Sequence, residues 1–206
     1  MSKPIIRGFP QSSYVMTARF AAAEKGVDYE FVPMAPGDEA LATHHPYKKV
    51  PSLEHGDVKL YETSAIVRYL DEAFDGPSLQ PGTPAGRALQ DQWISVANCY
   101  LYPHAVPRYI LQYIFPKGPG GTPDRTTIEA AVEDIDGDLA ILDAAYGDSP
   151  FLVGGQLTLA DTFVAPLYGG IARFPEGEKL IGKYDKVRAA LGALASRDGF
   201  KQALPG

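Results

Sequence analysis

Residues 50–66, which read VPSLEHGDVKLYETSAI, decide the fold class of the first part of this chain. Two short segments rich in strand-forming residues, 52–54 and 58–61, flank a turn at residues 55–57, and this arrangement is typical of a β-hairpin. The second segment runs directly into a helical pattern over Thr63–Ala73. The stretch therefore predicts a strand, a tight turn, a second strand and a helix.

The chain upstream of this stretch adds a strand–helix–strand unit. A short apolar segment begins at residue 5 and stops at Gly8. The alanine-rich stretch 14–25 is followed by a glycine, which is a common helix stop. Residues 27–32 alternate apolar and acidic side chains with the period of a strand, and residues 33–47 form a polar segment that predicts a loop. The predicted order is β-α-β-loop-β-β-α.

The chain downstream changes character. Residues 74–86 contain three prolines and three glycines, a composition typical of a linker between domains. Beyond them no strand pattern recurs, and apolar residues step by three and four over residues 128–146 and again over 187–194, as on one face of a helix. We therefore expect an α/β domain over residues 1–80 and an all-helical domain over residues 87–206.

Composition limits the classes of function. The chain has 206 residues, 45% of them hydrophobic, so it can bury a core without disulfide or metal support. A formal net charge of -6 argues against a nucleic-acid partner. We expect no metal site, because the four histidines lack ligand spacing, and no membrane span or signal peptide. The single cysteine, Cys99, fits a reducing compartment, so we expect a cytoplasmic protein with this thiol buried.

A hydroxyl-rich segment precedes the first predicted helix, where Ser12 lies at or just before the amino end. The simpler interpretation is an N-cap, which stabilises a helix by about 1 kcal/mol. The alternative is that the hydroxyl, the amide donors and the positive helix end together hold an anion such as a thiolate. No acid–histidine pair lies nearby and no G-x-S-x-G sequence is present, so we expect a hydrogen-bond donor rather than a nucleophile.

Two further junctions could either be structural or bind a ligand. Val50-Pro51 precedes a strand, where proline either marks a sheet edge or adopts the cis isomer. Glu62 and Thr63 stand where a strand passes into a helix, and the simplest interpretation is again a cap. Each signal is weak alone, and the inference depends on their order and spacing.

With these motifs in this order, the sequence resembles the cytosolic glutathione transferase family across nearly its whole length. Residues 8–15, G-x-P-x-S-x-Y-V, look like the amino-terminal motif of many bacterial members. Residues 45–51, HPYKKVP, are similar to the family's Asn-Pro-Phe-Gly-Lys-Val-Pro, and residues 60–66, LYETSAI, to its Leu-Tyr-Glu-Ser-Arg-Ala-Ile. Residues 158–161, TLAD, resemble its Ser/Thr-x-x-Asp capping box.

The resemblance implies a thioredoxin-like amino-terminal domain that binds glutathione, followed by an all-helical domain that completes the pocket for a small hydrophobic electrophile. It implies that Ser12 donates a hydrogen bond to the glutathione thiolate, and the adjacent Ser13 and Tyr14 remain open as alternatives. The other positions that match glutathione-binding residues of the family are Lys49, Val50, Pro51, Glu62 and Thr63.

The family topology also suggests which residues contact the electrophile. The candidates are Tyr14, Tyr100, His104 and Arg108. The last three recur every four residues and would face one way on a helix that Pro103 and Pro107 bend. Ordinary packing is the alternative for this stripe.

We therefore expect a homodimeric glutathione transferase with a role in detoxification. Residues 1–98 contain no cysteine, which excludes disulfide-exchange chemistry from the first domain. The alternatives are a glutathione-dependent isomerase or dehalogenase on the same scaffold, and a non-catalytic binding or adaptor protein. The identity of the electrophile stays open, as does the choice among conjugation, peroxide reduction and isomerisation.

Overall fold

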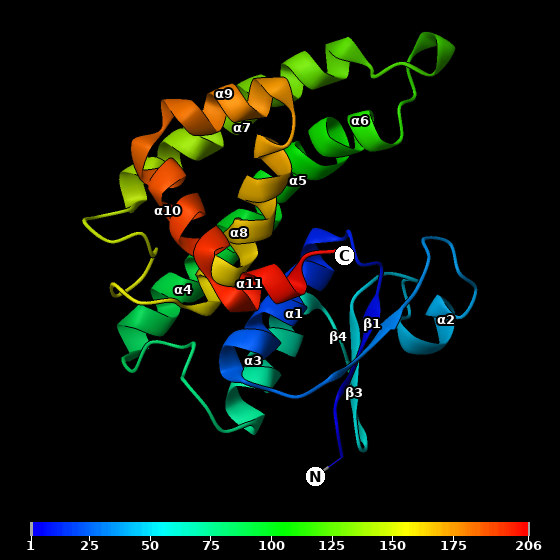
Figure 1. The fold of residues 1–206 in the computed structure, drawn as a ribbon, viewed down its shortest axis with the longest axis vertical. Coiled ribbons are helices and arrows are strands. Elements are labelled where there is room, and N and C mark those ends of the chain that lie inside the picture. Colours follow the sequence, from blue (N-terminus) through cyan, green and yellow to red (C-terminus); the bar gives the residue numbers. More distant parts are fainter. Residues whose placement is uncertain (1, 206) are drawn as a thin grey trace. The chain divides into compact units, whose positions relative to one another are not determined.

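The computed structural model describes residues 2–205, which form two compact units (Figure 1). One unit consists of residues 2–81 together with residues 195–205, and the other of Gly82–Leu194. The first has a small sheet flanked by helices and the second is helical. The predicted fold class is thereby confirmed.

The first unit is built on a four-stranded mixed sheet with the strand order β2-β1-β3-β4. Its elements are β1 (Ile5–Gly8), α1 (Ser13–Lys25), β2 (Glu30–Pro33), α2 (Leu41–His44), β3 (Ser52–His55), β4 (Val58–Tyr61), α3 (Thr63–Ala73) and α11 (Asp198–Ala203). β1 pairs with β2 in parallel, whereas β3 is antiparallel to both β1 and β4. The strand predicted over residues 27–32 begins at Glu30, and the predicted loop contains α2, which buries Leu41.

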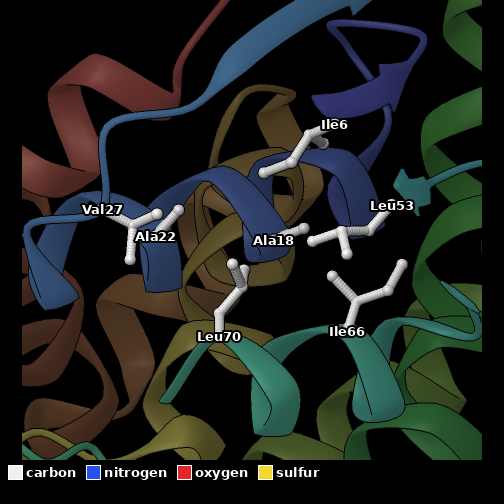
Figure 2. Close-up of a cluster of buried hydrophobic side chains, with 7 residues drawn as sticks. All are labelled: Ile6, Ala18, Ala22, Val27, Leu53, Ile66 and Leu70. Atoms are coloured by element: carbon white, nitrogen blue, oxygen red, sulfur yellow. The ribbon is translucent and has the colours of Figure 1, made fainter. Parts of the chain in front are cut away.

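One face of this sheet and two helices enclose the core of the unit. Ile6 of β1 is paired with Leu53 of β3, and directly paired residues point to the same face. Figure 2 shows these two side chains pointing toward Ala18 of α1 and toward Ile66 and Leu70 of α3. Burying each large side chain contributes about 1.5–3 kcal/mol. The core therefore fixes α1 and α3 against the sheet.

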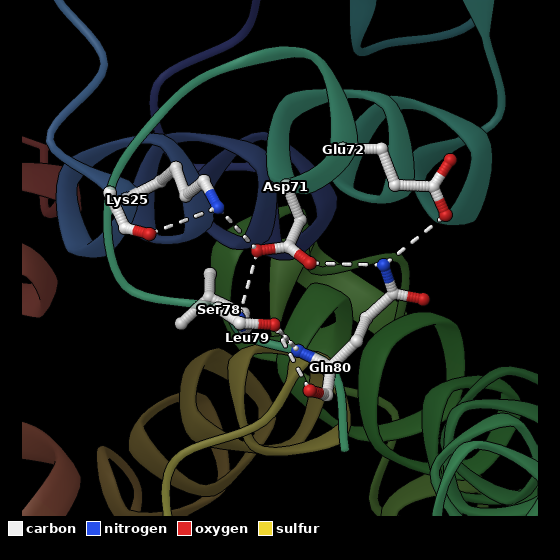
Figure 3. A network of polar contacts seen from close by, with 7 residues as sticks. Lys25, Asp71, Glu72, Ser78, Leu79 and Gln80 are labelled. Atoms are coloured by element: carbon white, nitrogen blue, oxygen red, sulfur yellow. Dashed lines mark hydrogen bonds and ion pairs between the residues drawn. The ribbon is translucent and has the colours of Figure 1, made fainter. Parts of the chain in front are cut away.

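A buried ion pair joins the ends of α1 and α3 (Figure 3). Lys25 Nζ lies 3.1 Å from Asp71 Oδ1, and their side chains are only 5% and 4% exposed. Asp71 also accepts the main-chain N–H of Leu79 at 2.8 Å and the side-chain amide of Gln80 at 3.0 Å. Residues 74–80, predicted as part of a linker, are thus held against the first unit.

The last helix, α11, packs against α1. Arg197 pairs with Glu24, and the rings of Phe20 and Phe200 meet edge to face with their centroids 5.2 Å apart. The sequence places this helix in the domain over residues 87–206, whereas the structure groups it with the first unit. The reason is that these contacts join the two ends of the chain.

The second unit is all-helical. Its elements are α4 (Pro84–Val96), η1 (Ala97–Leu101), α5 (Tyr102–Ala105), η2 (Val106–Ile110), α6 (Leu111–Ile114), η3 (Pro119–Gly121), α7 (Arg125–Ala145), α8 (Leu159–Ala172), α9 (Pro175–Lys183) and α10 (Asp185–Ser196), whose last two residues belong to the first unit. The apolar stripe predicted over residues 128–146 lies on α7, where Ile128, Ile135, Leu139 and Leu142 are buried.

The segment from α4 to α6 differs from the bent α-helix that the sequence predicts, because η1 and η2 are π-helical turns. Pro103 and Pro107 lack the N–H that an α-helix would donate four residues back, and wider turns accommodate that loss. Cys99, on η1, is exposed. The expectation that this thiol is buried is therefore wrong.

The predicted capping box at the start of α8 is confirmed. Asp161 accepts the main-chain N–H of Thr158 at 2.7 Å and that of Leu152 at 2.9 Å, while its own side chain is buried. Burial raises the pKa of Asp161 to about 6, against the effect of these N–H donors, which lower it.

Within the described part of the chain, no helix is long and apolar enough to cross a membrane. Over the same residues, His, Cys, Asp and Glu side chains form no group of three or more that could hold a metal ion.

Candidate functional site

The topology of the first unit brings three element ends to one edge of the sheet. β1 ends at Gly8, β3 begins at Ser52 on the antiparallel neighbour, and β4 ends at Tyr61. Arg7 is paired with Ser52 and Ser52 with Tyr61, so the three ends adjoin. The predicted glutathione-binding residues follow or precede these ends; they are Ser12, Lys49, Val50, Pro51, Glu62 and Thr63.

Ser12 is the N-cap residue of α1, and its C=O accepts the N–H of Met16 at 2.9 Å. Its side chain makes no capping hydrogen bond, so the hydroxyl is not used to close the helix. A helix leaves the amides of its first turn without intrahelical acceptors and carries partial positive charge there. A hydroxyl donor and a positive helix end therefore lie together. Tyr14 lies in the same first turn and is half-buried.

Gly8 allows β1, α1 and the segment before β3 to approach one another. A Cβ at this position would overlap the side chain of Val15 and lie 3.2 Å from the Cβ of Val50. Since only glycine leaves this space open, Val50 is placed close to the turn that leads into α1.

The Val50–Pro51 peptide bond is cis, one of the two forms that the sequence left open. Val50 lies outside β3, and within residues 2–205 its main-chain groups make no hydrogen bond to other main-chain groups. An extended ligand can pair with such groups as a short added strand.

Glu62 and Thr63 form a strained junction between β4 and α3. Glu62 has φ 69° and ψ 115°, a positive-φ conformation that glycine favours, at a cost of about 1–3 kcal/mol. The Glu62 carboxylate is exposed at the amino end of α3. Thr63 is buried. The junction thus offers a carboxylate, a hydroxyl and the first amides of α3.

A buried histidine anchors the loop before Val50. His45 is 4% exposed, and its Nδ1 accepts the main-chain N–H of Tyr47 at 3.1 Å. Its ring packs against that of Tyr61, with the centroids 4.9 Å apart. Burial lowers the pKa of His45, while the nearby Glu62 carboxylate acts in the opposite direction.

Two lysines follow on the same loop, and both are exposed. Lys48 has φ 52°, a left-handed conformation, at the position where the resembled motif carries glycine. The loop thus keeps the shape that glycine allows, at a cost of about 1–2 kcal/mol. Lys49 adds a positive charge directly before Val50.

The opposite face of the sheet is polar and carries a hollow of about 260 Å³. Residues 42–46 line this hollow, and Arg7 pairs with Glu54 at 3.0 Å across β1 and β3. Other residues that line the hollow are His45, Ser52, Lys59 and Tyr61.

The predicted electrophile-contacting residues of the second unit lie along the π-helical segment. His104 Nδ1 is 2.7 Å from Asp138 Oδ2, and Arg108 pairs with Asp134, one turn away on α7. Burial raises the pKa of Asp138, whereas His104 lowers it. Tyr100 is 57% exposed on η1. Two of these three side chains are therefore held by α7.

The sequence did not indicate three of these features: the left-handed backbone of Glu62, the anchoring by His45 and the pairing of His104 with α7. The sequence nevertheless contains a pattern that could have predicted two of them. His45 stands where the resembled motif has asparagine, and both side chains can accept an N–H two residues onward. Asp134 and Asp138 repeat the four-residue spacing of Arg108 and His104 with opposite charge.

Comparison with known proteins identifies the families and chains that this chain resembles. The family model described as glutathione S-transferase, N-terminal domain, matches residues 7–78, and the one described as glutathione S-transferase, C-terminal domain, matches residues 125–193. Glutathione S-transferase 3 of Zea mays is 28% identical over 96% of this chain and 91% of its own length. Glutathione S-transferase 4 of Zea mays is 32% identical over 78% of this chain and 75% of its own length.

Solved structures give the same result. Glutathione transferase F7 from Populus trichocarpa is 25% identical, with a TM-score of 0.87 and 97% of each chain covered. A glutathione S-transferase from Methylobacillus flagellatus, solved with GSH bound, has a TM-score of 0.85 at 24% identity, covering 99% of this chain and 100% of its own, which speaks for the fold alone. Because family models match both units and a relative at 32% identity is covered over three quarters of its length, this chain belongs to the glutathione S-transferase family.

Proposed function

We propose that this protein is a glutathione transferase in which the Ser12 hydroxyl donates a hydrogen bond to the glutathione thiolate. The observation that carries the proposal is that Ser12 begins α1 with its hydroxyl unused in capping. A free thiol has a pKa of about 8.5, and lowering that pKa to about 6.5 requires roughly 2.7 kcal/mol. A hydrogen bond to a charged group contributes about 1.5–3 kcal/mol and a helix end about 0.3–1 kcal/mol, so the two suffice.

The rest of the tripeptide follows the same edge of the sheet. The main chain of Val50, beside Pro51, pairs with the cysteinyl unit as an added strand. Glu62 binds the γ-glutamyl ammonium group, and Thr63 with the first amides of α3 binds its carboxylate. Lys49 pairs with the other glutathione carboxylate.

The bound thiolate attacks an electrophilic carbon of a small hydrophobic molecule. A C–S bond forms, and the carbon either expels a leaving group with its electron pair or, in a strained ring, transfers that pair to the ring heteroatom, which is then protonated. Holding both reactants together supplies much of the acceleration. Tyr14, Tyr100, His104 and Arg108 are the proposed contacts to the electrophile.

We also propose that the protein is a cytoplasmic homodimer with a role in detoxification. The thiol of Cys99 is exposed, which fits a reducing compartment. Tyr47 is an aromatic residue that is 72% exposed, which fits a contact surface for a second copy of the chain. Sedimentation at several concentrations measures the oligomeric state.

The experiment that tests the activity compares Ser12→Ala with Ser13→Ala as a matched control. For Ser12→Ala we expect the pKa of the bound thiol, read from thiolate ultraviolet absorbance, to return toward about 8.5. Turnover of an aromatic halide near pH 6.5 should fall about 10- to 100-fold, the equivalent of one charged hydrogen bond. Ser13→Ala should change neither quantity. An unaltered thiol pKa in Ser12→Ala would overturn the assignment.

A non-catalytic role is the second candidate, because fold does not determine function and one relative is not named as a transferase. That relative, the Stringent starvation protein A homolog of Coxiella burnetii, is 29% identical over 95% of this chain and 88% of its own length. Retention on immobilised glutathione without turnover of any aromatic halide would favour that role. Retention with turnover favours the transferase.

A further inference from the structure

Two hydrogen bonds hold residues 45–48 in a turn on the loop that carries Lys49 and Val50: the Lys48 N–H donates to the His45 C=O at 2.9 Å, and the Tyr47 N–H donates to a titratable side chain. Nδ1 of His45 accepts the N–H of Tyr47 at 3.1 Å, and this bond closes the turn over residues 45–47. Nδ1 can accept only while it carries no proton, so the neutral ring must hold its proton on Nε2. Protonation would turn Nδ1 into a second donor facing the Tyr47 N–H.

The bond from the Lys48 N–H to the His45 C=O joins main-chain groups and does not titrate, so only the bond to the ring can respond to pH. The ring is buried against Tyr61 at the end of β4, one residue before Glu62. Tyr47 and Lys49, which follow on the loop, are exposed. The bond from Tyr47 to the His45 ring therefore adds to the main-chain bond in ordering the segment that leads to Val50.

Charged groups face His45 from each element packed around it. Glu62 at the start of α3 favours the protonated ring, whereas Lys49 on the loop disfavours it, and burial, the largest effect, lowers the pKa of His45. From the sheet, the hollow that His45 lines also contains the charged groups of Arg7, Glu54 and Lys59, together with the neighbouring ring of His44 and the phenol of Tyr61.

We propose that His45 is a positioning residue for glutathione, whose neutral ring completes the binding conformation of residues 45–50. This inference rests on the proposed function and adds a pH dependence to it. Above pH 6.5 the ring is neutral and the loop is closed. As the pH falls through the lowered pKa of His45, protonation breaks the bond to Tyr47 and loosens the turn, and affinity for the tripeptide declines.

Asparagine at this position separates anchoring from titration. Its side-chain oxygen also accepts an N–H two residues onward but carries no proton at any pH of interest. His45→Asn therefore keeps the anchor without the titration, and His45→Leu removes both. All three proteins are compared by calorimetric titration with S-methylglutathione, whose sulfur does not ionise, between about pH 8 and pH 5.

We expect the dissociation constant of the unaltered protein to rise about three- to tenfold on acidification, the equivalent of one hydrogen bond. His45→Asn should bind with nearly constant affinity, and His45→Leu should bind weakly throughout. The same pH dependence in His45→Asn as in the unaltered protein would overturn the inference while leaving the proposed function intact. No binding by the unaltered protein at any pH would overturn both.

A measurement on the unaltered chain removes any dependence on variants that fold poorly. Nitrogen-15 chemical shifts of His45 report which ring nitrogen carries the proton. We expect Nδ1 unprotonated at neutral pH and a titration that coincides with the fall in affinity. A ring with Nδ1 protonated at neutral pH would contradict the inference.

Discussion

At the scale of the residue, backbone conformation and close approach decide where the proposed binding groups lie. Glu62 and Lys48 both adopt positive φ without being glycine, and both lie at the edge that carries Ser12 and Val50. A strained backbone conformation of this kind persists only where the surrounding structure enforces it, and it is commonly found at ligand sites. Gly8 contributes in a different way, because its lack of a side chain leaves room for Val15 and Val50.

Gly8→Ala tests that space. The added methyl group would overlap Val15 and press on Val50, so we expect a loss of about 1–3 kcal/mol in the free energy of unfolding. Because Val50 must move, affinity for glutathione should fall as well. Gly82→Ala is the control, because a Cβ there meets nothing within 4 Å. Chemical denaturation and calorimetry provide the two readouts, and equal values for both variants would contradict the expected overlap.

At the scale of the element, polar groups buried at helix ends hold the helices in place. Asp161 closes the start of α8, and the pair of Lys25 and Asp71 closes the ends of α1 and α3. Such groups stabilise only when their hydrogen bonds are complete, because a buried charge without a partner is costly.

Lys25→Met should therefore lower the free energy of unfolding by about 3–5 kcal/mol, since it leaves the buried Asp71 carboxylate without its cation. The double variant Lys25→Met with Asp71→Asn should be more stable than Lys25→Met, because a neutral amide can still accept the N–H of Leu79. Lys3→Met, which breaks the exposed pair with Asp28, should cost at most about 1 kcal/mol. Urea denaturation measures the free energy of unfolding of the three variants. A double variant less stable than Lys25→Met would contradict this account.

At the scale of the whole molecule, the two ends of the chain meet within one unit. α11 contributes Phe200 against Phe20 and Arg197 against Glu24, both on α1. The first unit is therefore incomplete until the last residues of the chain are present. Its stability depends on contacts that span nearly the full length of the sequence.

Phe200→Ala tests whether the packing of α11 on α1 stabilises the first unit. Removing the buried ring should destabilise the first unit by about 3–5 kcal/mol and speed hydrogen exchange of the α1 amides. Leu204→Ala, at a side chain that is 41% exposed, is the control and should change the exchange little. A chain ending at Leu194 should show the same effect as Phe200→Ala, only larger. Unchanged α1 exchange in the shortened chain would show that α11 does not stabilise this unit.

Features that depend on neighbours along the chain could be predicted from local sequence. The hairpin over residues 52–61, the helix at Thr63–Ala73 and the capping box at Thr158 and Asp161 each follow from local pattern. The candidate residues Ser12, Val50 and Glu62 were found because each flanks the end of a predicted element.

The tertiary structure decided what depends on residues far apart. Pairing of β1 with β3 set the end of β1 beside the two ends of the hairpin, and local pattern cannot specify such pairing. The packing of α11 on α1, the left-handed backbone of Glu62 and the π-helical turns around Pro103 and Pro107 likewise arise from surroundings rather than propensity. The physical reason is that local propensities are worth tenths of a kcal/mol per residue, whereas burial of a side chain is worth about 1.5–3 kcal/mol.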